Sequence, residues 1–151
     1  MMNGGLDQDW DAVTQADVDA AELGDLIPTG TYEGLVQSYT KRIVEKEESP
    51  FFGLPIARLT VDLFDVPVND SPQTRKYFAD VTSAQVRQKD GRVAEPSRLG
   101  AQLARHTNTV GKPFGETLET ALVTRLRFRV RLSPAKDRYE ARNWTDAITA
   151  L

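Results

Sequence analysis

The chain has 151 residues, of which 40% are hydrophobic and 27% charged, a balance that fits one globular domain with a single core. It contains no Cys, which excludes disulfides and thiolate chemistry, and no apolar run approaches the ~20 residues of a membrane-spanning helix. The start of the chain is acidic and lacks the basic and apolar regions of a secretory signal. We therefore expect a cytoplasmic protein with no membrane association.

The net charge of −3 averages two regions of opposite sign. Residues 1–26 contain seven acidic residues and no Lys or Arg, so they carry −7. All 19 basic residues and the other 15 of the 22 acidic residues lie in residues 27–151, which carry +4. We interpret residues 1–26 as an acidic, flexible tail with at most a short amphipathic helix over residues 15–23. Such a tail can keep the protein soluble, compete with a nucleic acid for a basic face, or bind replication or recombination proteins.

Three strands are predicted in the first half of the body. Residues 31–40 follow a Pro-Thr-Gly turn and are rich in strand-forming residues. Residues 56–66 alternate between apolar and polar side chains, and residues 75–81 form a shorter candidate strand. The polar residues 41–53 are expected to form a loop or a long hairpin end, and a turn is expected at residues 67–72.

Helices and two more strands follow. Residues 95–107 begin with Glu-Pro-Ser and carry apolar residues at helical spacing, and residues 115–121 are a candidate for a second short helix. Residues 122–132 alternate apolar side chains with arginines and are the clearest strand of the chain, and residues 139–144 form a final short strand. Five short strands with a helix between the third and the fourth predict a mainly β fold, a five-stranded OB-fold-like Greek-key barrel over residues 27–151.

Residues suited to catalysis are few. His106 is the only histidine, and on an apolar helix face it is more often structural than catalytic. With one His and no Cys, the usual zinc sets cannot form, and there is no Walker A motif, dinucleotide fingerprint or nucleophile elbow. The carboxylates Asp62, Asp65 and Asp80 show no metal-binding spacing. We therefore expect a protein that is not an enzyme and needs no metal or cofactor.

Four alternating arginines are the sharpest feature of the sequence. Arg125, Arg127, Arg129 and Arg131 would lie on one face of a strand at a spacing of ~6.6–6.8 Å. Guanidinium groups pair with phosphates and stack on bases, so a row of them without an intervening acid favours binding to a nucleic-acid strand. The alternative is a solvated face whose arginines pair with carboxylates of neighbouring strands.

Aromatic side chains beside basic ones extend this candidate site, because bases stack on aromatic rings. Arg75 and Tyr77 would share one strand face, and Phe51 and Phe52 lie in the loop that follows Lys41 and Arg42. For any single aromatic residue, a place in the core is the more common outcome. The predicted site for single-stranded DNA consists of Lys41, Arg42, Phe51, Phe52, Arg58, Arg75, Tyr77, Arg125, Arg127, Arg129 and Arg131.

With these residues assigned, a family resemblance follows. Residues 27–33, Ile-Pro-Thr-Gly-Thr-Tyr-Glu, resemble the opening P-x-G-x-Y strand of short phage single-stranded-DNA-binding proteins. The order of the later elements over residues 27–148 is also similar, up to a short last strand that carries Asn143. The resemblance implies an OB-fold that coats single-stranded DNA in phage or prophage replication and recombination. Such proteins often have a C-terminal acidic tail, whereas here the acidic segment is N-terminal.

Together these features predict a non-sequence-specific single-stranded-DNA-binding protein of the cytoplasm. One alternative is a structural protein of a phage virion or tail, in which the basic face contacts the carboxylates of another subunit. The other is a nuclease that uses carboxylates and magnesium. The oligomeric state stays open, a homo-oligomer included.

Overall fold

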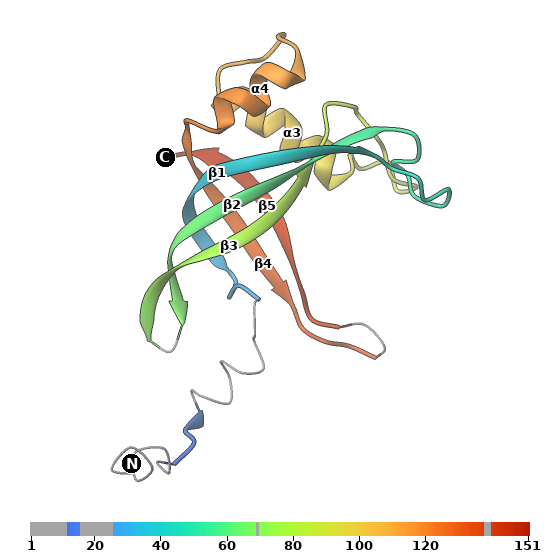
Figure 1. Ribbon diagram of the computed structural model, residues 1–151. Coiled ribbons are helices and arrows are strands. Elements are labelled where there is room, and N and C mark those ends of the chain that lie inside the picture. The colour runs from blue at the N-terminus through green and yellow to red at the C-terminus, as the bar shows by residue number, and fades with distance from the viewer. Residues whose placement is uncertain (1–11, 16–25, 69, 138–139) are drawn as a thin grey trace, which may run out of the picture.

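The computed structural model describes residues 12–15, 26–68, 70–137 and 140–151 (Figure 1). The predicted helix over residues 15–23, and with it most of the acidic tail, lies outside the described residues. The described elements follow the predicted order of three strands, helical segment and two strands. They are β1 (Gly30–Ile43), β2 (Pro55–Val68), β3 (Ser71–Val81), α3 (Glu95–His106), α4 (Phe114–Ala121), β4 (Arg125–Ser133) and β5 (Arg142–Ala150).

The five strands form one antiparallel sheet in the order β3-β2-β1-β4-β5. Figure 1 shows this sheet strongly curved, with both helices near one end and the β2–β3 and β4–β5 hairpins extending the other way. Within the described residues, β3 and β5 are the two edges and do not pair, so the sheet is open. The mainly β class with five antiparallel strands is confirmed, whereas the OB-fold-like Greek-key barrel stays a prediction.

Strict alternation decides which side of the sheet is buried. In β2, Leu59, Val61 and Leu63 are completely buried, and in β4 Leu126 and Phe128 are equally so. Successive side chains of a strand point to opposite faces, so these residues share the concave side on which the core forms. The other side carries the polar side chains and is called the outer face below.

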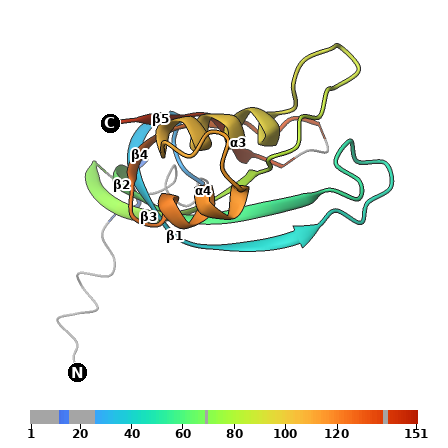
Figure 2. The ribbon, with the colours of Figure 1, turned by 90° about the horizontal axis from the view of Figure 1, so that it is seen from above.

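Helix α3 covers the gap between the two sheet edges. Viewed from above, it lies along β5 (Figure 2). The backbone N–H of Thr82, just after β3, donates to the carbonyl oxygen of Pro96 at 2.9 Å, and the N–H of Ile148 in β5 donates to Oε1 of Gln102 at 2.8 Å. Gly100 allows the close approach, because a Cβ there would lie 2.1 Å from the carbonyl oxygen of Thr82. Edge groups that a closed barrel would pair in a ladder are thus satisfied by the helix.

The edges also meet through side chains. The hydroxyl groups of Tyr77 in β3 and Thr145 in β5 share a hydrogen bond of 2.6 Å, and both residues are buried. We call this line of contact between β3, α3 and β5 the seam.

Several predicted boundaries were wrong. The expected turn at residues 67–72 is mostly strand, because β2 continues to Val68 and β3 already begins at Ser71. Residues 122–124 do not begin β4, since their N–H groups bond to carbonyl oxygens of the last turn of α4. The last strand is Arg142–Ala150, later and longer than the expected residues 139–144.

Asn143 fixes the start of the body. Its Oδ1 accepts from the N–H of Ile27 at 2.7 Å, and its Nδ2 donates to the carbonyl oxygens of Ile27 and Arg131 at 2.7 and 3.2 Å. Ile27 is itself only 1% exposed. The asparagine therefore joins the residues after the acidic segment to the β4–β5 hairpin.

Candidate nucleic-acid interface

The arginines of β4 lie on the outer face, as the alternation predicts. Arg125, Arg127 and Arg129 are exposed and Arg131 is half-buried. Leu126, which alternates with them, is fully buried. Their common side is therefore confirmed.

The alternative interpretation, in which the arginines pair with carboxylates of neighbouring strands, holds for three of the four. Arg125 pairs with Glu33 of β1, and its guanidinium lies 4.7 Å from the centre of the Phe64 ring. Arg129 and Arg131 both pair with Asp146 of β5, at 2.7 and 3.1 Å. The acids come from the two strands that flank β4, so the sequence of β4 alone did not reveal them.

A β-bulge positions the shared acid. The register between β4 and β5 shifts after the Arg129–Ala147 pair, leaving Asp146 as the extra residue. Burial opposes ionisation of Asp146, but the hydrogen bonds and charges of Arg131 and Arg129 outweigh it and hold its pKa below its usual value. Among the described residues, Arg127 is the one arginine of β4 with no ion-pair partner.

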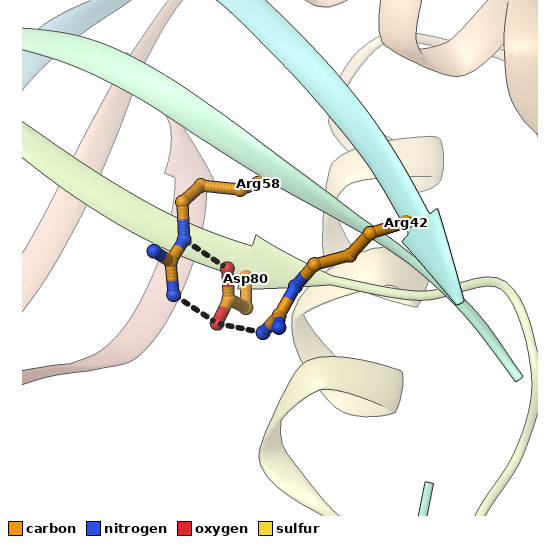
Figure 3. Close-up of polar contacts among 3 residues, drawn as sticks. All are labelled: Arg42, Arg58 and Asp80. Atoms are coloured by element: carbon orange, nitrogen blue, oxygen red, sulfur yellow. Dashed lines mark hydrogen bonds and ion pairs between the residues drawn. The ribbon is translucent and has the colours of Figure 1, made fainter. Parts of the chain in front are cut away.

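A second basic cluster lies on the outer face where β1, β2 and β3 run side by side (Figure 3). Arg58 of β2 forms a two-point contact with Asp80 of β3, with Nε to Oδ1 at 3.0 Å and the second guanidinium nitrogen to Oδ2 at 3.2 Å. Arg42 of β1 approaches the same carboxylate at 4.0 Å from its other side. Two cations share one anion, so the cluster keeps a net charge of +1 and both guanidinium groups stay about half exposed.

Phe78 is the exposed aromatic residue beside this cluster. Its side chain is 55% exposed, and it lies on the outer face of β3 between Lys76 and Asp80. An aromatic ring left in water at the centre of a strand face adds nothing to the core and is available to a partner. Phe78 was absent from the predicted site. Its position two residues from Lys76 and from Asp80 nevertheless indicated that its side chain lies on the polar face of the strand.

Tyr77 requires a correction. We expected it to stack on bases, but it is only 6% exposed, and its hydroxyl bonds to Thr145 in the seam. Arg75 shares its inward side of β3 and is half-buried, so these two residues do not join Phe78 on the outer face. Burial is also the main reason that the pKa of Tyr77 rises to about 12.

The β1–β2 loop is only partly basic. Phe52 is 53% exposed and Phe51 is half-buried, as a ligand-binding loop would allow. The loop also contains three glutamates beside Lys46, so its own charge is negative. Lys41 is separated from Arg42 because neighbouring strand residues point to opposite sides, and it lines a hollow beside α4 with Phe114 and Leu118.

Searches among family models, curated proteins and solved structures found no match to this chain. Across the ranges that the structure describes, no three His, Asp or Glu side chains gather as a metal ion would require. In the same ranges, no helix is long and apolar enough to cross a membrane. His106 is half-buried on α3. The geometry of the outer face therefore carries the functional proposal.

Proposed function

We propose that the protein binds single-stranded DNA without sequence specificity, through the outer face of its sheet. The observation that carries the proposal is the exposed ring of Phe78 with Lys76, Arg58 and Arg42 around it. Aromatic rings that stack on bases, next to cations that neutralise phosphates, are the two components of single-strand binding sites. Sequence preference should be slight, because neither component reads base edges.

The strand order supports the same proposal. β1 lies between β2 and β4, and the helices follow β3, which is the arrangement of an OB-fold. OB-folds are partly open barrels that bind oligonucleotides on the face of their second and third strands, and β2 and β3 carry the cluster around Phe78. The proposal therefore includes an OB-fold in which α3 bridges the edges β3 and β5.

The cations have graded roles in this proposal. Lys76 is exposed and has no ion pair in the described structure, so it reaches a phosphate without giving up a partner. Arg127 of β4 is likewise exposed and has no ion pair in the described structure, so it is equally available to a phosphate. Arg58 and Arg42 keep Asp80 as a neighbour, and the carboxylate weakens their pull on phosphates.

The test is fluorescence anisotropy with a labelled oligo-dT at 50 and 200 mM salt. We expect steep salt dependence, a roughly 5- to 150-fold weaker affinity for Phe78→Ala, and a salt slope lower by about one for a Lys76 substitution such as Lys76→Gln. Lys112→Gln is the matched control, since Lys112 is an exposed lysine between α3 and α4. Salt-independent binding, or equal affinities for all three variants and the wild type, would remove the proposed site.

The biological setting in the proposal is the cytoplasm of a bacterial host during phage or prophage replication and recombination, which follows from the family resemblance alone. A structural role in a virion or tail is the alternative outcome. The ion pairs of Arg125, Arg129 and Arg131 within one chain leave fewer free cations for another subunit's carboxylates. Self-association without oligonucleotide binding would favour that alternative.

A further inference from the structure

The seam contains a cleft that the proposed function does not yet use. It encloses about 190 Å³ between β3, β5 and the start of α3. Tyr77 and Thr145, whose hydroxyl groups share a hydrogen bond, are among the residues that line it, and so are Pro96 and Leu99 of α3. An apolar cavity of about 150 Å³ accepts a benzene-sized ring, so the cleft has room for one small aromatic ring system.

Two aromatic side chains line the cleft from opposite strands. Phe78 belongs to β3, where its ring is 55% exposed, and Trp144 belongs to β5, where it is half-buried. The indole Nε1 of Trp144 donates to Oγ of Ser133 at 3.0 Å, which fixes the orientation of its ring. A flat ligand in a cleft lined by these two residues would have an indole ring and a phenyl ring within its reach for stacking.

The charges lining the cleft select the part of a nucleotide that can enter. Glu95 and Asp80 both line it, so a phosphate would meet two carboxylates. The cations lie outside: Arg58 pairs with Asp80, and Arg142 is close enough to act on the charge of Glu95. A carboxylate accepts hydrogen bonds from the amino groups of bases, whereas the phosphate backbone is drawn to the arginines at the rim.

We propose that the cleft takes one base of the bound strand between Phe78 and Trp144, and that Glu95 accepts a hydrogen bond from an amino group of that base. The inference rests on the proposed function and adds a local preference to it. Cytosine, adenine and guanine carry such an amino group and thymine does not, so the cleft favours these three bases over thymine. One hydrogen bond supports a preference of roughly two- to tenfold.

The test uses the fluorescence of Trp144 in the full chain with Trp10→Phe, since the chain contains only these two tryptophans. Oligo-dC and oligo-dT are titrated while a terminal label reports binding independently. We expect Trp144 emission to change on binding, oligo-dC to bind two- to tenfold more tightly than oligo-dT, and Glu95→Gln to shift that ratio. Glu116→Gln, on the exposed side of α4, is the matched control and should leave the ratio unchanged.

The outcomes separate the two proposals. If the terminal label reports binding but Trp144 emission stays constant and both oligonucleotides bind equally, the cleft is not a base site and the proposed function stands. If neither oligonucleotide binds, the proposed function fails and the base site fails with it. A Glu95→Gln ratio equal to that of wild type, with emission still changing, overturns the hydrogen bond and therefore the inference as stated.

Discussion

The hydrogen bond between Tyr77 and Thr145 offers a direct test of how the open sheet is held together. The two hydroxyl oxygens are 2.6 Å apart, and the residues are 6% and 5% exposed. Tyr77→Phe keeps the ring and removes one hydroxyl, which leaves the hydroxyl of Thr145 buried without this partner. Thr145→Val does the reverse. A buried polar group that loses its partner costs about 1–3 kcal/mol, so each single substitution should lower the free energy of unfolding by that amount.

The double variant distinguishes this explanation from ordinary loss of packing. Replacing both partners removes the unsatisfied group as well as the bond, and such paired replacements are close to neutral. The double variant should therefore cost no more than either single variant, which is at least about 1–3 kcal/mol less than the sum of the two. Urea unfolding followed by circular dichroism measures all four proteins, and an unchanged slope against urea shows that the unfolded states are comparable. Additive effects would refute the reasoning, because they would mean that the two hydroxyl groups act independently, for example through water in the cleft.

Two further predictions concern the same region. Burial raises the pKa of Tyr77 to about 12, from about 10 in an unfolded chain, and the hydrogen bond with Thr145 opposes this rise. The contribution of Tyr77 to stability is therefore complete below pH 10 and is lost as the pH rises toward 12. Urea unfolding between pH 9 and 11.5 should show wild type losing stability relative to Tyr77→Phe, and a constant difference would contradict the burial of this group. Gly100→Ala should destabilise the protein by several kcal/mol, because the new Cβ would meet the carbonyl oxygen of Thr82 at 2.1 Å. A Cβ at Gly115 in α4 would meet nothing nearer than Nζ of Lys41 at 4.0 Å, an ordinary contact, so Gly115→Ala should raise stability by up to about 1 kcal/mol. Equal thermal midpoints for the two variants would contradict the close approach of α3 to β3.

The alternation of residue types was sufficient to predict the faces of the strands but not their neighbours. Leu126, Phe128 and Val130 are buried and the arginines between them are not, which follows from the two-residue period of a strand. The acids that neutralise the arginines depend on register. Glu33 lies 92 residues before Arg125, and Asp146 faces its two arginines only because a bulge adds one residue to β5. No local pattern in the sequence contains that information.

The two adjacent aromatic residues of β3, Tyr77 and Phe78, show what the alternation could have predicted. Tyr77 alternates with Ala79 and Val81, whereas Phe78 alternates with Lys76 and Asp80, so the sequence indicated which ring was buried. Tyr77 was included in the predicted DNA site because basic residues lie near it in the sequence, and that choice ignored the two-residue period of the strand. The seam could not have been predicted in this way, because the meeting of β3 and β5 depends on the curvature of the whole sheet and on the glycine that lets α3 approach.

The outer face has two basic regions, one around β4 and one around β3, which differ in net charge and in whether an aromatic ring is open to a ligand. Around β4, four arginines and the acids Glu33 and Asp146 leave +2, but the nearby ring of Phe64 is already covered by Arg125. Around β3, Lys76, Arg58 and Arg42 with the acids Asp80 and Asp62, the latter opposite Lys76 in the register, leave +1, and the ring of Phe78 is open. Surface ion pairs contribute at most about 1 kcal/mol, whereas a stacked base contributes about 1–3 kcal/mol, so the binding strand should be anchored at Phe78 and drawn toward β4 by charge. Three strand spacings separate β3 from β4, at least about 14 Å along the sheet. Under the proposed function, a bound strand of about 4–16 nucleotides, the site size of OB-folds, would be long enough to occupy both regions. DNA binding should therefore need both regions. Stacking on Phe78 would fix where the DNA strand lies, and the arginines of β4 would draw the rest of it across the sheet.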